Sequence, residues 1–198
     1  AEIKNIIDTA NAMADVAREV ILPRFRSNSL VTENKSLDSF DPVTDADKVA
    51  EKVMISELQK RRPTDGVFGE EFGELNGESL YRWVLDPIDG TRAFISGAPT
   101  WGVLISLEKI GAGPIFGIID QPYIGERFFG GLGMAEYKKH DEIIKLKTSG
   151  VEEIENAILL STFPEIGTER DRKAFERVSK NAKLTRYGLD CYGYALVA

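Results

Sequence analysis

Apolar side chains recur at three- and four-residue steps along the first twenty residues. This pattern runs from Ile3 to Ile21, with polar residues between the apolar ones. A spacing of this kind places the apolar side chains on one face of a helix. It therefore predicts an amphipathic helix over 3–21, which Pro23 stops.

A second helix is predicted to begin at Thr44 or Asp45 and to end before Pro63. The apolar residues expected to face inward from it are Val49, Val53, Ile55 and Leu58. The stretch 27–42 between the two helices is polar and has no sustained period, so we expect a mobile loop that carries one isolated cation, Lys35.

Two short apolar runs that follow each end in acidic residues. Val67 and Phe68 lead into the segment 69–71, Gly-Glu-Glu, and the run 81–85 leads into Asp86. Runs of this length and composition are typical of strands. The pattern predicts two strands that deliver carboxylates from their C-terminal ends.

The rest of the chain shows two different patterns of apolar and polar residues. Apolar runs separated by Gly, Pro and charged turns predict an antiparallel meander over 101–107, 114–119, 127–130, 135–138 and 143–146. Beyond Gly150 the pattern predicts alternating strands and helices over 157–162, 168–180, 184–187 and from 189 onward. We therefore expect an N-terminal α+β part over 1–150 and the start of an α/β part over 151–198. The last predicted helix reaches Ala198 without a cap, which favours a chain cut within an element.

Composition narrows the class of protein. The 25 basic and 32 acidic residues give a formal net charge of −7, and no basic run is present, which argues against nucleic acid as a partner. No apolar stretch approaches the roughly 20 residues of a membrane span, and the N-terminus does not have the pattern of a signal peptide, so we expect a cytoplasmic protein. The single cysteine, Cys191, is expected to be a buried structural residue, and the single histidine, His140, a loop residue.

The segment 83–94, Trp-Val-Leu-Asp-Pro-Ile-Asp-Gly-Thr-Arg-Ala-Phe, carries most of the candidate chemistry. Pro87 keeps Asp86 extended, and a turn after it is expected to bring Asp89 back beside Asp86. Two carboxylates this close repel each other unless cations lie between them, and hard divalent cations prefer such oxygen ligands. Gly90 allows a close approach of other groups, and a short helix from Thr91 would present free N–H groups to an anion.

Simpler interpretations of the same residues remain open. Asp86 and Asp89 can be a turn former and a helix cap, and Glu70 can be a solvated loop residue. Asp45 and Asp47 at a helix start suit the helix dipole without any further role. Only convergence of these acids in space would make them functional.

Three segments together resemble the inositol monophosphatase family of metal-dependent phosphatases. They are 69–71 (Gly-Glu-Glu), 86–91 (Asp-Pro-Ile-Asp-Gly-Thr) and 43–47 (Val-Thr-Asp-Ala-Asp). The resemblance covers essentially the whole chain, and the second segment is its most specific motif. It implies a layered αβαβα sandwich of the inositol monophosphatase and fructose-1,6-bisphosphatase type, of mixed α+β and α/β character.

The resemblance also implies roles for the acids. Glu70, Asp86 and the backbone carbonyl of Ile88 would bind one Mg²⁺, and Asp86 with Asp89 a second, with two or three ions in the complete site. Glu70 would position and deprotonate the attacking water, together with Thr91 supported by Asp47. Gly90 and Thr91 would bind the phosphate, and Lys35 matches a basic residue of the mobile loop. Hydrolysis would be direct, without a phosphoenzyme.

Family members carry a further metal-binding Asp beyond the last residue of this chain. We therefore expect a C-terminal part that is incomplete, and either a truncated chain or an impaired enzyme. Relatives are commonly homodimers, and the meander 101–130 offers a surface for pairing.

Segments 92–97 and 187–194 look most like the histidinol-phosphate phosphatase branch of the family. Histidinol phosphate carries an ammonium group, with which Asp190 could pair, while Asp89 and Arg92 would contact other parts of the substrate. Asp190 as an ordinary helix N-cap is an equally good interpretation. The hypothesis is hydrolysis of histidinol phosphate by water that metal ions activate, with inositol monophosphate or a related sugar or nucleotide phosphate as the alternative.

The same residues argue against other classes of phosphatase and against nucleotide binding. A haloacid-dehalogenase-type phosphatase needs two Asp residues two apart at the end of a buried strand, whereas Asp86 and Asp89 are three apart and Asp45 and Asp47 lead into a helix. Glycines 111, 113 and 117 lie between antiparallel-looking strands, which favours a turn over a dinucleotide loop. A metal-dependent binding protein that has lost turnover remains an alternative of another class.

Overall fold

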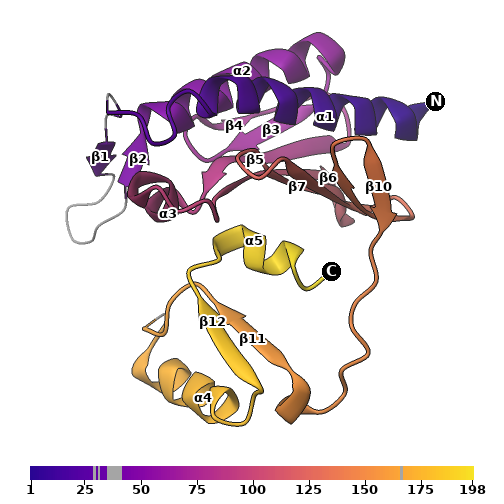
Figure 1. Ribbon diagram of the computed structural model, residues 1–198. Coiled ribbons are helices and arrows are strands. Elements are labelled where there is room, and N and C mark those ends of the chain that lie inside the picture. Colours follow the sequence, from indigo (N-terminus) through magenta and orange to yellow (C-terminus); the bar gives the residue numbers. More distant parts are fainter. Residues whose placement is uncertain (29, 31, 35–41, 166) are drawn as a thin grey trace.

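The computed structural model describes residues 1–198 apart from 29, 31, 35–41 and 166. Two long helices, α1 (Glu2–Ile21) and α2 (Asp45–Arg61), pack side by side on one face of an eight-stranded sheet (Figure 1). Both helices were predicted, with bounds that agree to within a residue or two. Neither these helices nor any other in the described part of the chain is long and apolar enough to cross a membrane.

The sheet has the strand order β10-β9-β8-β7-β6-β5-β3-β4. Its strands are β3 (Gly66–Gly69), β4 (Gly73–Leu75), β5 (Tyr81–Asp89), β6 (Gly102–Lys109), β7 (Gly113–Gln121), β8 (Glu126–Gly131), β9 (Met134–Lys139) and β10 (Glu142–Lys145). Neighbouring strands from β5 to β10 pair antiparallel, which confirms the predicted meander. The exception to antiparallel pairing is β3 with β5, which run in the same direction. Strand β4 reverses the chain on the outer side of β3, so that β5 can return on the other side.

The turns of the meander agree with the predictions made for them. Gly111 and Gly113 lie at the β6–β7 turn with positive φ angles of 83° and 85°, so this glycine-rich segment is a hairpin connection. His140 lies in the turn between β9 and β10, as expected of a loop residue.

The core lies between the two helices and the sheet. The largest fully buried side chains are Trp83, Trp101, Phe94, Ile6, Met13, Ile21, Met54, Leu58, Leu85, Ile88, Ile105 and Leu107. One prediction for α2 is wrong in detail, because Val49 and Val53 are only half-buried. Ala46, Ala50 and Met54 face the core in their place. The small side chains of Ala46 and Ala50 let α2 approach the sheet and α1 closely.

The stretch predicted as a loop between the helices contains two short strands. β1 (Thr32–Asn34) and β2 (Pro42–Thr44) pair antiparallel and lead directly into α2. Lys35, predicted as the cation of this loop, lies outside the described residues. Strands of three residues are too short for a period-2 pattern to reveal them.

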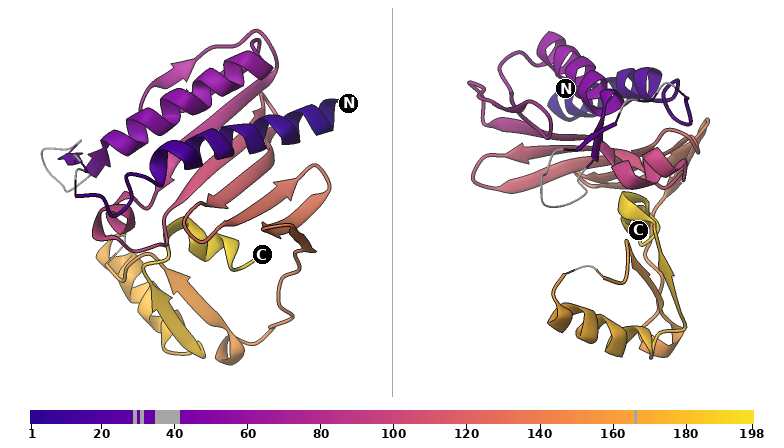
Figure 2. Two further views of the ribbon diagram at one scale, coloured as in Figure 1. Left: turned by 45° about the horizontal axis from the view of Figure 1, so that its top comes forward. Right: turned by 90° about the vertical axis from the view of Figure 1, so that its left-hand side faces the viewer.

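The chain beyond β10 builds a second, smaller group of elements. They are a single turn of 3-10 helix (Ile154–Asn156), β11 (Ile158–Ser161), α4 (Glu169–Ser179), β12 (Leu184–Tyr187) and α5 (Asp190–Ala195). Strands β11 and β12 pair parallel. Helix α5 lies between the large sheet and this strand pair, and α4 covers the far side of the pair (Figures 1 and 2). The layers thus follow the order αβαβα that the sequence led us to expect. Helix α5 ends at Ala195, three residues earlier than the predicted helix.

Candidate active site

The parallel pair β3–β5 brings two predicted carboxylates to the same edge of the sheet. In this pair Gly69 is opposite Leu85, so Glu70 and Asp86 follow at matching positions. The carboxyl ends of parallel strands meet at one edge, whereas those of antiparallel neighbours lie at opposite edges. The only parallel pairing among the described strands of the large sheet is therefore what places Glu70 beside Asp86.

A β-bulge places Asp89 on the same side of the sheet as Asp86. Side chains three residues apart in a regular strand point to opposite faces. Opposite β6, however, Asp86 pairs with Leu104 and Asp89 with Gly102, so β5 advances three residues while β6 advances two. The extra residue in β5 cancels the alternation. The prediction that the chain turns between the two acids is wrong in this respect, since β5 continues to Asp89 and the turn comes at Gly90.

The electrostatics of Asp86 show that the acids converge. Burial, above all, together with the charges of Glu70 and Asp89, raises the pKa of Asp86 to about 8. The carboxyl groups of Asp86 and Glu70 are also joined by a hydrogen bond, and Asp47 adds a weaker electrostatic effect. A carboxyl group in such surroundings stays protonated near neutral pH unless a positive charge is added. Glu70 lies exposed in the turn after β3, as the simpler interpretation expects, but its carboxyl group is not isolated, because it interacts with Asp86.

Asp47 closes the start of α2 and also belongs to this neighbourhood. Its Oδ2 accepts hydrogen bonds from Thr44 N at 2.8 Å and from Thr44 Oγ1 at 2.5 Å, which completes a capping box. Burial, only partly offset by these bonds, raises the pKa of Asp47 to about 6. The helix-start interpretation of Asp47 is thus confirmed, and it does not exclude a role at the site. Thr91 Oγ1 donates to Ile88 O at 3.1 Å, and its predicted support by Asp47 stays a prediction.

Asp190 reaches the site from the other end of the chain. Gly90 has a positive φ of 86°, and a Cβ added to it would lie 3.0 Å from Cβ and Cγ of Asp190. Gly90 therefore allows a close approach, as predicted, and the approaching group is Asp190. Burial, and next the charge of Asp89, raise the pKa of Asp190.

The start of α5 is fixed by Asp89. The N–H of Cys191 donates to Asp89 Oδ2 at 2.7 Å, and the Cys191 side chain is buried, as expected of a structural cysteine. Asp190 itself is the first residue of α5 with φ 44°, and it follows the N-cap Leu189. The N-cap interpretation of Asp190 is therefore wrong, and its side chain makes a bond with Thr100 Oγ1 at 3.4 Å instead.

The remaining predicted residues lie on α3 (Thr91–Ser96), which follows Gly90 directly. This confirms the predicted short helix. Arg92 is exposed on it, and its contact with substrate stays a prediction. The same holds for the binding of phosphate by Gly90 and Thr91.

Glu51 is a residue of this region that the sequence pattern did not single out. It lies one helical turn after Asp47 on α2, and its side chain is fully buried. Its carboxylate accepts hydrogen bonds from the backbone N–H groups of Glu71 and Phe72, in the turn that carries Glu70. The i, i+4 spacing from Asp47 is a signal that could have pointed to it, because it places both acids on one helix face.

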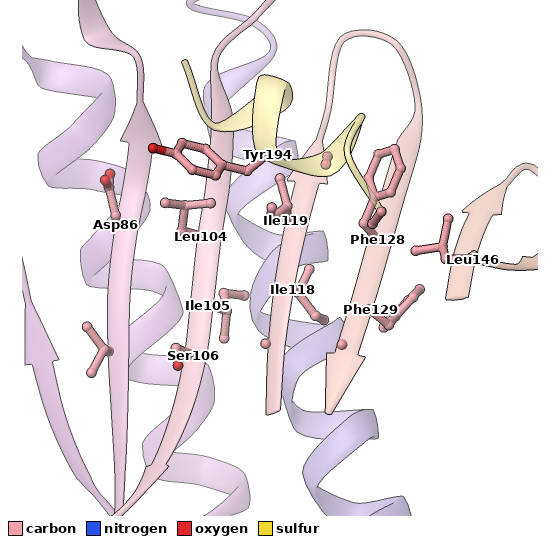
Figure 3. Close-up of a pocket in the computed structure, with 15 residues that line it drawn as sticks. Asp86, Leu104, Ile105, Ser106, Ile118, Ile119, Phe128, Phe129, Leu146 and Tyr194 are labelled. Carbon is pink, nitrogen blue, oxygen red and sulfur yellow. The ribbon is translucent and has the colours of Figure 1, made fainter. Parts of the chain in front are cut away.

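A cavity of about 470 Å³ adjoins Asp86 on the sheet face opposite α1 and α2. Figure 3 shows Asp86 at one end of it, Leu104, Ile119 and Phe128 along the strands, and Tyr194 of α5 extending across it. Apart from Asp86, Ser106 and Tyr194, its lining is apolar. Asp86 thus stands at the edge of an apolar hollow between the sheet and α5.

The donor set fits a hard divalent cation. Carboxylates and a backbone carbonyl are the ligand types that Mg²⁺ prefers, and a bound cation would counteract the burial and the repulsion that raise the pKa of Asp86. In the described ranges, no three Asp, Glu, His or Cys side chains are arranged as a ready-made cage for an ion. The side chains instead face one another, with Asp86 bonded to Glu70.

Comparison with known proteins places this arrangement in a family. The chain is 39% identical over its full length to the bifunctional phosphatase IMPL2, chloroplastic, of Arabidopsis thaliana, and spans 56% of that protein. It is 34% identical over 193 residues to a histidinol-phosphatase of Chlorobaculum parvum, of which it spans 72%. The solved structure of an inositol monophosphatase from Zymomonas mobilis matches all of this chain with a TM-score of 0.80 at 34% identity, and the match covers 74% of that structure. The model of the inositol monophosphatase family matches residues 2–198, and the chain belongs to that family, close to its histidinol-phosphatase branch.

Proposed function

We propose that the protein hydrolyses a small phosphate monoester, histidinol phosphate foremost, with Mg²⁺ ions held by Glu70, Asp86, Asp89 and the carbonyl of Ile88. The observation that carries this proposal is the convergence of Glu70 and Asp89 on half-buried Asp86 at one edge of the sheet. Metal dependence is general in the family, whereas the choice of Mg²⁺ and of two or three ions is part of the proposal. Because the chain spans only part of its relatives, the activity is proposed for the protein as a whole.

The predicted site residues have different parts in the proposed reaction. Glu70 lies at the exposed rim of the acid cluster, where it would take the proton of the attacking water. Thr91 and Asp47 would orient that water, and Gly90 with Thr91 would bind the phosphate at the start of α3. Mg²⁺ would supply the positive charge that acidifies the water and offsets the charge of the phosphate oxygens. The acid cluster explains why this cation is needed, since its own charges repel an anionic substrate.

The substrate preference is argued from Asp190. This carboxylate lies against Gly90 and beside Asp89, so it borders the proposed phosphate site. A carboxylate at that place can pair with the ammonium group of a substrate, which it binds more strongly than the neutral hydroxyl groups of a polyol. The name of the Chlorobaculum relative, a histidinol-phosphatase, agrees with this choice.

Inositol monophosphate is the alternative substrate, because relatives named inositol-1-monophosphatase also match the chain at 39% and 44% identity over part of its length. A sugar or nucleotide phosphate belongs to the same alternative, and a metal-dependent binding protein without turnover is the alternative of another class. We also propose that the protein forms a homodimer and lies in the cytoplasm.

Phosphate release tests the reaction and the substrate together. The protein is assayed with histidinol phosphate, inositol monophosphate, a sugar bisphosphate and an adenosine bisphosphate, with and without Mg²⁺. We expect Mg²⁺-dependent release, fastest from histidinol phosphate. Equal or faster release from inositol monophosphate would reject the substrate, and ligand binding without any release would support the binding protein.

Asp190→Asn sharpens the substrate test. Asparagine keeps the size of the side chain and tolerates the positive φ of this position, but it removes the charge. We expect KM for histidinol phosphate to rise about 10-fold, the equivalent of losing ~1.4 kcal/mol of a charge-assisted contact. KM for inositol monophosphate serves as the comparison and should rise less, because its hydroxyl groups carry no positive charge. A parallel loss on both substrates would show that Asp190 supports the site without recognising the ammonium group.

A further inference from the structure

Glu51 is a buried acid to which the proposed reaction gives no part. Its side chain is 0% exposed within α2, among residues that face the sheet and the β3–β4 turn. Burial of a carboxylate is costly unless hydrogen bonds compensate for it. An apolar side chain would fill this space without the cost of burying a charge. The contacts of the Glu51 carboxylate therefore need an explanation.

The two oxygens of Glu51 bind consecutive backbone groups just after Glu70. Oε2 accepts from the N–H of Glu71 at 2.8 Å, and Oε1 accepts from the N–H of Phe72 at 2.9 Å. These N–H groups belong to the turn that joins β3 to β4. The carboxylate therefore fixes the backbone on the C-terminal side of Glu70.

The same carboxylate also lies against the backbone on the N-terminal side of Glu70. A Cβ added to Gly69 would lie 1.8 Å from Oε1 of Glu51 and 2.4 Å from its Cδ. Gly69 thus leaves room for the carboxylate to lie directly over the last residue of β3. Glu51 in this way touches the residues on both sides of Glu70 from the neighbouring helix.

We propose that Glu51 is a positioning residue that holds the turn so that the Glu70 side chain is presented to the divalent cation beside Asp86. This inference rests on the proposed function, because it gives Glu51 a role through a predicted metal ligand. Without the two backbone bonds, the turn would have to be ordered at the moment of metal binding, and the affinity would fall by that cost. A merely structural acid would affect the stability of the fold and leave the metal affinity of the folded protein unchanged.

Calorimetric titration of Mg²⁺ into the protein tests this role without relying on turnover. Glu51→Gln keeps the shape of the side chain but replaces one acceptor oxygen with an NH₂ group that cannot accept from a backbone N–H. We expect the Mg²⁺ dissociation constant to rise about 10-fold, the lower end of the effect of outer-shell partners of metal ligands. Leu58→Ala on the same helix removes a buried side chain far along α2 and is the matched control. It should lower the unfolding midpoint and leave the dissociation constant unchanged.

A double-mutant cycle supplies a second readout. Gly69→Ala should weaken Mg²⁺ binding in the otherwise unchanged protein, because the new methyl group displaces the Glu51 carboxylate. In a Glu51→Ala background that space is free, so the same change should add little. Additive effects in the cycle would contradict the proposed contact.

The outcomes separate this inference from the proposed function. Mg²⁺ binding to wild type and to Glu51→Gln with equal affinity overturns the role of Glu51 alone. A wild-type protein that takes up no Mg²⁺ overturns the metal site, and the role of Glu51 falls with it. Weaker binding by Leu58→Ala to the same degree as by Glu51→Gln would assign the effect to general loosening of α2, which also overturns the inference.

Discussion

Helices α1 and α4 show how differently the two ends of the chain are packed. Seven residues of α1 are buried against α2 and the sheet, namely Ile6, Thr9, Ala10, Met13, Ala14, Ala17 and Ile21. None of the described residues of α4 is buried, although its apolar side chains lie on one side and Phe175 contacts Tyr187 of β12. The first region therefore has a core of its own, whereas the region of β11, α4 and β12 depends on its contacts with other elements.

The link between the regions is helix α5. Tyr192 donates a hydrogen bond to Glu126 of β8 at 2.7 Å, and its ring contacts Phe128. Cys191 N–H binds Asp89 at the start of the same helix. Asp190 directly precedes these two residues in α5. The residue that we propose to recognise the substrate is therefore held against the first region by a few specific contacts of α5. The acids that we propose to bind metal belong instead to the well-packed region.

Removal of a large apolar side chain from each region is the strongest test of this contrast. Leu107→Ala, at a fully buried position of β6, should lower the free energy of unfolding by about 2–5 kcal/mol. Leu184→Ala, at a position of β12 that is 40% exposed, should lower it by about 0.5 kcal/mol. Urea denaturation followed by far-UV circular dichroism measures both, since the two tryptophans, Trp83 and Trp101, lie in the first region and their fluorescence would not report on β12. Similar losses for both variants would mean that the two regions share one core.

Tyr192→Phe tests the anchor of α5 with a smaller expected effect. The change removes one hydrogen bond to a largely buried carboxylate, which should cost about 1–2 kcal/mol. Hydrogen exchange should then become about 5- to 30-fold faster in α5, β11 and β12 and stay unchanged in α1. Tyr187→Phe is the control, because it keeps the ring that contacts Phe175. Equal acceleration in α1 would show that the regions open as one unit.

Acid should weaken the same anchor, by less than the loss of Tyr192. Burial raises the pKa of Glu126, but the hydrogen bonds from Tyr192, Lys139 and Tyr137 outweigh it, and the pKa lies below its ordinary value of 4.5. The folded state thus binds this proton more weakly than the unfolded state does. The stabilisation by Glu126 is complete above pH 4.5 and is lost as the pH falls below that value. The stability difference between wild type and Glu126→Gln in urea titrations should accordingly shrink below pH 4.5, and a constant difference would contradict the prediction.

Long patterns made much of the fold predictable. The helix that Pro23 stops and the strands of the meander extend over enough residues for their periods to appear. β1, β2 and β4 have three residues each, so their pairing is decided by neighbours and not by their own pattern. The inward positions of α2 were also misassigned in part, because alanines pack where the valines were expected.

The sequence allowed us to predict which acids belong to the candidate site, but not which tertiary contacts hold them in place. Glu70, Asp86 and Asp89 follow apolar strands, which is visible in the chain itself. The bulge in β5 depends on its pairing with β6, and the contact of Glu51 depends on how α2 lies over the β3–β4 turn. Both are properties of tertiary packing, and a single Glu in a helix is on average a surface residue.

The bulge in β5 decides how this site could be transplanted into another protein. Copied onto a regular strand, the sequence Asp-Pro-Ile-Asp would send its two carboxylates to opposite faces of the host sheet. The smallest transferable unit is therefore the motif together with the stretch of β6 from Gly102 to Leu104. Three residues of β5 advance opposite two residues of this stretch, and this difference produces the bulge. A graft of the four-residue sequence alone would place one of its two aspartates on the wrong face of the host sheet.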